Sequence, residues 1–375
     1  MRKSVVPLRF GVLGTGRITR KVGPAIARTP GAELAAVASR DVARAEAWAR
    51  EHGARRHYGS YDALLDDPDL DAVYIALPPA LHREWTVKAA ERGLHVLCEK
   101  PLAATLDDAV AMAAACREHN VQLMDGVMWV HTPRAAMMRS VIDSGTLGEI
   151  QRVTSAFTFR AEGWFGDEFR LASDLGGGCL LDLGWYCVGV SLWAFGAAAA
   201  RSQGAVRGGE GETGRGRESS AHDGHPLSHS PPHPLIDSVT ATATWSGEID
   251  VSFFGHLCFT GSGAASFDCG FETAMRKWVE IAGTHGSLVC DDFTRPWSPE
   301  KARFWVHGDF GKATEHRSEP FDQEQCLIAT FCACVRNGPD HSWGERAVAV
   351  QRVCEDLMRS ARRAWNLEQR TSTNA

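Results

Sequence analysis

Short apolar runs alternate with amphipathic segments through the first third of the chain. The runs have the length of buried strands: Leu8–Leu13, Glu33–Ser39, Ala72–Leu77, Leu94–Cys98 and Val121–Met124. The segments between them repeat apolar residues at helical spacing: Arg17–Arg28, Val42–Glu51, Leu81–Arg92 and Leu106–His119. Strands and helices that alternate with short loops predict an α/β domain with a doubly wound parallel sheet over residues 1–127.

After residue 127 the pattern changes. Glu149–Phe159 alternates with a period of two, and several β segments follow one another from Ser238 onward. Helical spacing predicts four further helices: Arg134–Ser144, Cys179–Phe195, Asp322–Arg336 and Glu345–Trp365. Strands in succession predict an open-faced, mostly antiparallel sheet. Residues 128–375 are therefore expected to form a second, α+β domain.

Residues 197–235 interrupt this second domain. The segment has no Phe, Tyr or Trp and is rich in Gly, Ser, Pro and Arg, so it cannot bury enough apolar surface to order itself. We expect a flexible insertion. Its four histidines are metal ligands by type (His222, His225, His229 and His233), but no Cys or carboxylate cluster accompanies them, and no metal site is expected.

Composition limits the choice of function. The chain has 375 residues, 44% of them hydrophobic, and a net charge of −6 without a basic block. This balance argues against nucleic acid and anionic membranes as partners. The 11 Cys residues include no C-x-x-C pair, and neither a signal peptide nor an apolar run of membrane-spanning length is evident. We expect a cytoplasmic protein with reduced thiols.

Gly14 and Gly16 lie between the first strand and the first helix. Glycines at this point let the backbone approach a pyrophosphate, and the helix N-terminus supplies free N–H groups. We therefore expect Gly14, Gly16, Arg17 and Ile18 to bind a dinucleotide. Thr19 stands where the motif has its third glycine, which weakens the match.

The end of the second strand bears on the choice of dinucleotide. NAD enzymes place an acidic residue there for the ribose 2′-hydroxyl, whereas this chain has Ser39 and Arg40. Arginine pairs well with a 2′-phosphate, so NADP is predicted, with NAD as the alternative. Asp41 is better explained as a helix cap, and the competing interpretation of Arg40 is a solvated surface residue.

The residues LHVLCEKP, Leu94–Pro101, predict a buried strand that ends on a lysine. Lys100 would lie at the carboxyl end of a parallel strand, where α/β sheets bind ligands. Asp182 and Tyr186 stand four residues apart behind three glycines, on one face of a helix. A phenol can transfer a proton if a nearby ammonium lowers its pKa toward neutral. The alternative is that Asp182 caps the glycine turn and Tyr186 is a core residue.

Four motifs together resemble one family. CEKP, the N-terminal G-x-G, PPALH (Pro78–His82) and GGGCLLDLGWYCV (Gly176–Val188) are similar to the glucose–fructose oxidoreductase/inositol dehydrogenase/MocA family. The resemblance implies a Rossmann domain, an open-faced sheet domain and hydride transfer between nicotinamide and a substrate carbon. Lys100 matches the family's catalytic lysine and Asp182 its active-site aspartate. Tyr186 resembles the dihydrodiol dehydrogenase branch, which uses Tyr as acid/base and often prefers NADP.

Two further groups of residues complete the predicted site. Residues at the ends of the central strands are expected to border the cofactor: Leu77, Pro78, His82, Glu99 and Lys100, with His82 mainly holding its loop. The segment Asp125–Arg134 resembles a little-characterised subgroup. Its Trp129, His131 and Arg134 either line the sugar site or pack the hinge between the domains.

The sequence thus predicts an NADP(H)-dependent oxidoreductase that acts on a CH–OH or C=O carbon of a sugar, polyol or cyclic diol. One alternative is a redox-neutral glycosidase, which would be expected to carry His at position 186. The other is a non-catalytic sensor of NADP and sugar. The exposed sheet face predicts a homo-oligomer, either a dimer or a tetramer.

Overall fold

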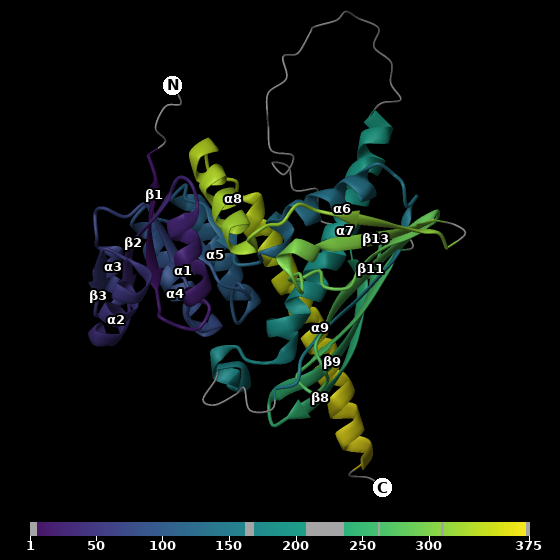
Figure 1. The fold of residues 1–375 in the computed structure, drawn as a ribbon. Helices are drawn as coiled ribbons and strands as arrows, with labels where there is room; N and C mark the ends of the chain where they lie inside the picture. Colours follow the sequence, from purple (N-terminus) through teal and green to yellow (C-terminus); the bar gives the residue numbers. More distant parts are fainter. Residues whose placement is uncertain (1–5, 162–168, 208–235, 262, 309–310, 373–375) are drawn as a thin grey trace, which may run out of the picture.

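The computed structural model describes residues 6–161, 169–207, 236–261, 263–308 and 311–372. Two sheets, each covered by helices, lie beside one another, and the long C-terminal helix runs along the second (Figure 1). The chain leaves the first sheet near residue 125, and its last two helices pack back against the first domain.

The first sheet has six parallel strands in the order β3-β2-β1-β4-β5-β6. They are β1 (Leu8–Leu13), β2 (Ala32–Ala38), β3 (Arg56–Tyr58), β4 (Ala72–Ile75), β5 (His95–Cys98) and β6 (Leu123–Asp125). The helices between them are α1 (Thr19–Arg28), α2 (Val42–His52), α3 (Tyr61–Leu65), α4 (His82–Glu91) and α5 (Leu106–Glu118). This order confirms the predicted doubly wound sheet, and it brings all six carboxyl ends to one edge.

Local hydrogen bonds fix the starts of α1 and α2. Asp41 accepts the N–H groups of Ala43 and Arg44, so it caps α2 as predicted. The Thr19 hydroxyl donates to the carbonyl of Gly16 at 2.6 Å and accepts the indole N–H of Trp48 at 2.9 Å. The threonine that departs from the third glycine therefore ties the glycine loop to both α1 and α2.

The second sheet has eight strands in the order β14-β13-β12-β11-β7-β10-β9-β8. They are β7 (Ile150–Thr158), β8 (Ile236–Ser246), β9 (Ile249–Phe259), β10 (Ala264–Gly270), β11 (Arg276–Gly283), β12 (Gly286–Cys290), β13 (Arg303–Gly308) and β14 (Ala313–Arg317). Only β7 and β10 pair in parallel, which confirms the mostly antiparallel prediction.

Helices α6 (Pro133–Asp143), α7 (Trp185–Arg207) and α9 (Ser342–Ser372) lie on one side of this sheet (Figure 1). On β9, Phe253 and Leu257 are fully buried, whereas Phe254 is 55% exposed between them. The alternation shows that the sheet has one helix-covered face and one open face. The homo-oligomer predicted from that open face stays a prediction.

The helix predicted at Cys179–Phe195 begins and ends at other residues in the structure. It starts as a π turn at Leu180–Gly184, and α7 then continues to Arg207. The predicted flexible insertion is therefore wrong over its first part, because residues 197–207 extend the helix. Its remaining residues and its four histidines lie outside the described residues. Among those described, no group of three or more His, Cys, Asp or Glu residues could hold a metal ion.

One segment contradicts the expectation that no apolar run reaches membrane-spanning length. Ser173–Gly196 is long and apolar enough, with a mean hydropathy of 1.4 in an 18-residue window. However, 83% of that window is buried inside the protein. Its apolar character is therefore accounted for by the core of the second sheet.

The last two helices connect the halves of the molecule. On α8 (Gln323–Asn337), Phe331 packs against Phe10 of β1 with ring centroids 5.6 Å apart, and Arg336 donates to the carbonyl of Gly31. Helix α9 contacts α5 and β6 at one end and β8 at the other. This packing holds the carboxyl edge of the first sheet against the helix-covered face of the second.

Candidate active site

Strand β5 delivers Lys100 to the junction of the two halves. Val96, Leu97 and Cys98 are fully buried, and the strand ends at Cys98, two residues before the lysine. The Lys100 ammonium donates to a carboxylate oxygen of Asp182 at 2.7 Å and to its carbonyl at 2.9 Å. The lysine that follows β5 and the aspartate of the second domain therefore meet in an ion pair.

Asp250 of β9 holds the π turn that carries Asp182. A carboxylate oxygen of Asp250 accepts the backbone N–H of Leu180 at 2.7 Å and contacts the Cys179 thiol at 3.3 Å. Gly178 has φ +116°, and a Cβ there would stand 2.0 Å from Asp250, so the turn requires glycine. Asp250 performs the capping that the alternative interpretation assigned to Asp182, and the sequence analysis did not find it.

Asp182 is paired by a second cation that the sequence analysis also missed. Arg170, in the short helix Phe169–Leu171, donates its Nε–H to the other carboxylate oxygen at 2.8 Å. Burial alone would raise the pKa of Asp182, but Lys100 and Arg170 outweigh it and hold the pKa below its ordinary value. The three groups form a cluster of two cations and one carboxylate, so its net charge is positive.

Tyr186 follows the π turn at the start of α7. The Lys100 ammonium lies 5.2 Å from its ring centroid, and the ring packs edge-on against Phe157 of β7 at 5.3 Å. Burial raises the pKa of Tyr186 above its ordinary value, although Lys100 acts in the opposite direction. The expectation that Lys100 brings this pKa toward neutral is therefore wrong, because burial of the phenol outweighs the effect of the ammonium.

The loop after β1 fits a dinucleotide pyrophosphate. Gly14 has φ +98°, and a Cβ there would stand 2.8 Å from the carbonyl of Ala76. A Cβ on Gly16 would meet only that same carbonyl, at 3.9 Å, so the backbone at Gly16 is open. Gly16 and Arg17 are exposed, and Ile18 directly precedes α1. The loop thus presents free backbone and a helix N-terminus at the carboxyl edge of the sheet.

The end of β2 presents the two residues that were predicted to select the dinucleotide. Ser39 is buried, and its hydroxyl accepts the backbone N–H of Asp41 at 3.3 Å. Arg40 is exposed beside it. With Asp41 engaged as a cap, a guanidinium rather than a carboxylate is the charge available at this position.

The residues that follow β4 and were predicted to border the cofactor differ in their exposure. Pro78 is partly exposed, and Leu77 is buried. The His82 ring is fully buried, with one nitrogen 2.8 Å from the carbonyl of Leu77 and the other 3.1 Å from the carbonyls of Pro101 and Leu102. His82 therefore joins the β4 loop to the Lys100 loop, as expected of a residue that holds its loop.

Glu99 lies buried directly after β5, where its charge acts on Tyr186. Its carboxylate accepts the Tyr74 hydroxyl at 2.6 Å inside the sheet domain and is 8% exposed as a residue. The carboxylate also accepts the backbone N–H of Lys100 at 3.2 Å. Its side chain thus holds the end of β5 in place, and its predicted cofactor contact stays a prediction.

The three residues predicted to line the sugar site lie inside the domain junction. Trp129 is 2% exposed and packs edge-on against Trp193 and Phe293. His131 is buried against Trp343, and burial lowers its pKa to about 3, so it is neutral. For both residues the hinge-packing alternative describes the observed position.

The structure places Arg134 away from its predicted position in the sugar site. Its side chain is 3% exposed, forms an ion pair with Asp292, and donates to the carbonyls of Asp292 and Phe293 at 2.9 and 3.1 Å. A guanidinium that is fully engaged inside the protein cannot hydrogen-bond a sugar hydroxyl. The expectation that Arg134 contacts substrate is therefore wrong, because Asp292 draws the side chain inward.

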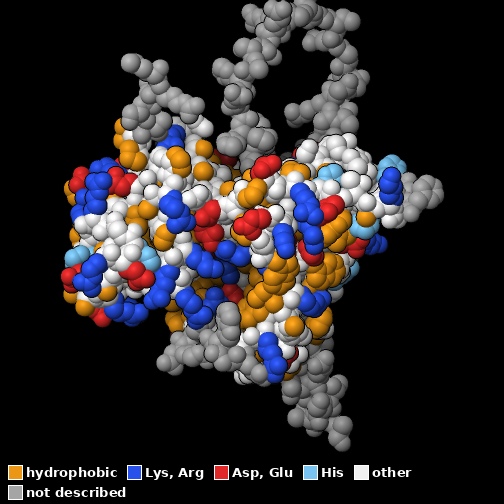
Figure 2. All heavy atoms as spheres, in the orientation of Figure 1, with side chains coloured by type: hydrophobic (Ala, Val, Ile, Leu, Met, Phe, Trp, Pro, Cys, Tyr) orange, Lys and Arg blue, Asp and Glu red, His pale blue; other side chains and the backbone are white. Residues whose placement is uncertain are grey.

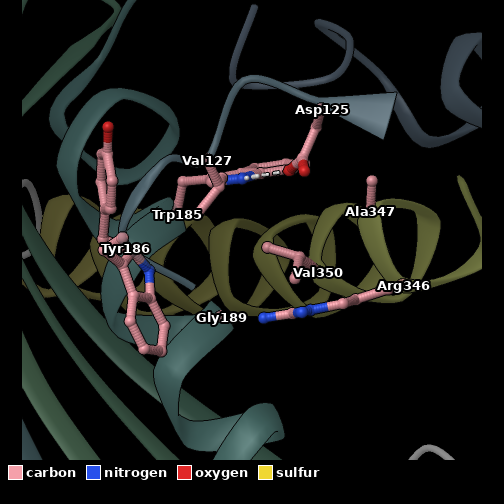
Figure 3. A pocket seen from close by; sticks show the side chains of 9 residues that line it. Asp125, Val127, Trp185, Tyr186, Gly189, Arg346, Ala347 and Val350 are labelled. Atoms are coloured by element: carbon pink, nitrogen blue, oxygen red, sulfur yellow. Dashed lines mark hydrogen bonds between the residues drawn. The ribbon is translucent and has the colours of Figure 1, made fainter. Parts of the chain in front are cut away.

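Figure 3 shows a small cavity behind Tyr186, between the end of β6 and the helices α7 and α9. The Trp185 indole donates to Asp125 at 3.3 Å, and Arg346 lies on the opposite wall. Burial raises the pKa of Asp125 to about 6. The Tyr186 hydroxyl points away from this cavity (Figure 3), so the reactive end of the phenol faces elsewhere.

Replacing Arg134 is expected to affect stability rather than substrate affinity. Arg134→Met leaves the Asp292 carboxylate buried without its cation, which costs about 3 kcal/mol of unfolding free energy. The matched control is Arg117→Met, which breaks an exposed pair with Glu345 and should cost less than about 1 kcal/mol. Denaturant unfolding measures both. A raised KM with unchanged stability in Arg134→Met would contradict the assignment.

Comparisons with known proteins agree with this geometry. Residues 8–127 match the family described as "Oxidoreductase family, NAD-binding Rossmann fold", and residues 135–289 match the GFO/IDH/MocA C-terminal domain. D-xylose 1-dehydrogenase (NADP(+)) 2 of Haloferax volcanii is 31% identical over 94% of this chain and 97% of its own length. A dTDP-3,4-didehydro-2,6-dideoxy-alpha-D-glucose 3-reductase of Saccharopolyspora spinosa is 39% identical over 90% of each chain.

A solved structure extends the likeness to the whole fold. KijD10, a 3-ketoreductase from Actinomadura kijaniata in complex with NADP and TDP-benzene, superposes with a TM-score of 0.78. It is 25% identical and covers 94% of this chain and 98% of its own. On the two family matches and these relatives, the chain belongs to the glucose–fructose oxidoreductase/inositol dehydrogenase/MocA family and is an NAD(P)-dependent oxidoreductase.

Proposed function

We propose that this protein is an NADP(H)-dependent sugar oxidoreductase in which Tyr186 exchanges a proton with the reacting oxygen. Lys100 and Asp182 complete the catalytic group. The observation that carries the proposal is the meeting of an ammonium and a phenol from the two halves of the chain, with Lys100 5.2 Å from the Tyr186 ring. Cyclic diols and polyols are included as substrates because they present the same CH–OH group.

Each residue has a separate task in the reductive direction. The nicotinamide of bound NADPH supplies the hydride to the carbonyl carbon. Tyr186 donates its hydroxyl proton to the carbonyl oxygen, where negative charge develops. Lys100 stabilises that charge, and Asp182, fixed by Arg170 at 2.8 Å, holds the ammonium in place. The raised pKa of Tyr186 favours this direction, because it keeps the phenol protonated at neutral pH.

The substrates of the relatives support a sugar. The Haloferax volcanii relative is named a D-xylose 1-dehydrogenase, and the Saccharopolyspora spinosa relative is named a reductase of a dTDP-linked dideoxyglucose. Both are redox enzymes of a sugar carbon, one named for oxidation and one for reduction. We infer the same class of reaction here, without carrying over either substrate.

The test is absorbance at 340 nm with NADPH and NADP⁺ over a panel of aldoses, ketoses, polyols and cyclic diols. We expect turnover with at least one sugar and a higher kcat/KM with NADP(H) than with NAD(H). Cofactor binding without turnover across the panel would favour the sensor, and release of sugar from an aryl glycoside without net redox change would favour the glycosidase.

Arg40 is expected to determine the preference for NADP. Arg40→Gln removes the charge at the end of β2 and should weaken NADP⁺ binding about tenfold or more while leaving NAD⁺ binding unchanged. Arg50→Gln, at the exposed far end of α2, the helix that follows Arg40, is the matched control. Fluorescence titration with each cofactor measures the dissociation constants. Equal losses for both cofactors would refute the assignment.

A further inference from the structure

Basic and aromatic side chains continue along the sheet beyond Tyr186. Phe157, which packs against Tyr186, pairs in register with Lys277 on β11. Residues directly opposite one another on neighbouring strands project from the same face of a sheet. Lys277 therefore lies on the helix-covered face. Phe157 contacts Tyr186, and Lys277 is the neighbour of Phe157 on the adjacent strand.

Protein acceptors do not take up all the N–H donors of the Lys277 ammonium. The residue is 5% exposed, and its ammonium donates to the carbonyl of Arg295 at 2.6 Å. No carboxylate of the described residues forms an ion pair with it. Asp292, the nearest acidic residue in its strand register, is engaged by Arg134 and by the Trp297 backbone N–H at 2.7 Å. An ammonium carries three N–H donors; the Arg295 carbonyl takes one and the Trp297 ring lies against another, which leaves one for a ligand.

The loop after β12 adds a second cation and an aromatic surface. Arg295 forms an ion pair with Glu324 of α8 and is close enough to Tyr186 to act on its charge. Trp297 is 58% exposed, and the Lys277 ammonium lies 3.7 Å from its ring centroid. On the face shown in Figure 2, Lys and Arg side chains gather along the junction of the two halves, although the chain as a whole is acidic.

Burying an ammonium without a counter-ion costs free energy, and a bound anion would recover it. Burial lowers the pKa of Lys277 and outweighs the opposing effect of Asp292 and Asp291 on its charge, so the compensating negative charge is incomplete. Among anions carried by sugars, a phosphate offers several acceptor oxygens, enough to contact an ammonium and a guanidinium together. An exposed indole beside it provides a flat surface on which a ring can stack.

We propose that the substrate is a sugar carrying a phosphate, and that this phosphate binds Lys277 and Arg295 beside the exposed face of Trp297. The reacting carbon then lies at Tyr186, and Phe157 lines the path between the two. A sugar phosphate and a nucleoside diphosphate sugar both supply this chemistry. The inference rests on the proposed function, since it names the substrate class of the same site.

The test is isothermal titration of the full chain saturated with NADPH, which blocks the cofactor site to nucleotides. The probes are dTDP, glucose 1-phosphate and glucose. At least one phosphate probe should bind more tightly than glucose, and Lys277→Met should weaken it at least tenfold. Lys301→Met, at an exposed lysine that follows in the same connection, should change nothing. Lys277→Arg, which keeps the charge, should restore most of the affinity.

Trp297→Ala distinguishes the two sources of phosphate. A loss confined to dTDP identifies a nucleotide-linked sugar, and similar small losses for both probes identify a simple sugar phosphate; either result supports the site. The inference is overturned if neither phosphate probe binds more tightly than glucose, or if Lys277→Met binds both as wild type does. A thermal melt of Lys277→Met confirms that the variant is folded.

Turnover separates this inference from the proposed function. If neutral sugars react with NADP(H) and Lys277→Met leaves their rates unchanged while phosphate probes do not compete, the phosphate site is refuted and the oxidoreductase stands. If phosphate probes bind in a Lys277-dependent manner but no sugar or sugar phosphate is turned over, the reaction is refuted and the site stands.

Discussion

Lys100→Met is expected to lower turnover by about 10²- to 10³-fold while leaving NADP⁺ affinity close to that of wild type. The reason is that its ammonium is the group that stabilises charge on the reacting oxygen, and such a preorganised donor typically contributes this much. Methionine fills a similar volume without the charge. Asp182 keeps one cation in the variant, because Arg170 still holds its second oxygen at 2.8 Å.

The control for this variant is Lys88→Met. Lys88 belongs to the same domain but pairs with Glu84 and Asp62 on the surface of α4, so its loss should not change turnover. Stopped-flow measurement of a single turnover separates the chemical step from cofactor release, and titration gives the cofactor affinity. A Lys100→Met enzyme with a wild-type chemical step would remove Lys100 from the mechanism.

The fold was predictable wherever an element is long enough to show its period. The parallel sheet, the mostly antiparallel sheet and their helices follow from apolar runs and helical spacing. Strand β3 and helix α3 were missed because they span only three and five residues. Strands β10, β13 and β14 were missed as well, and β14 has no buried residue to mark it.

The candidate site was predictable where a motif combines a backbone requirement with a chemical group. Lys100 and Asp182 lie at the ends of recognisable elements, and the structure brings them within 2.7 Å of one another. Arg170 carries no such signal, since it lies in a short irregular segment whose position depends on the packing of the glycine turn. Arg134 was misplaced because its partner Asp292 is 158 residues away in sequence.

The direction of the Tyr186 pKa shift depends on a competition that sequence spacing does not contain. An ammonium near a phenol lowers the phenol's pKa only as far as its charge is not already balanced. Here Asp182 is closer to Lys100 than Tyr186 is, and burial of the phenol then dominates. The phenol is therefore a proton donor at rest, and this state sets the pH behaviour of both reaction directions.

Tyr186→Phe is expected to lower turnover by about 10²- to 10⁴-fold, the usual contribution of a positioned acid or base. The change removes one oxygen and keeps the ring that packs against Phe157 and lies under the Lys100 ammonium. Cofactor affinity and stability should therefore stay near their wild-type values. Tyr58→Phe, which removes a phenol bonded to Asp67 far along the first sheet, is the matched control and should leave turnover unchanged.

The pH dependence makes the prediction specific to proton transfer. Reduction uses the protonated phenol, and its pKa lies above the ordinary value of 10.0, so the wild-type reductive rate should stay level from neutral pH to about pH 10. Oxidation uses the phenolate, so its rate should rise about tenfold per pH unit over the same range. Tyr186→Phe should lose that rise. A variant that keeps the wild-type slope would show that another group, or water, transfers the proton, and the assignment of Tyr186 would have to be given up.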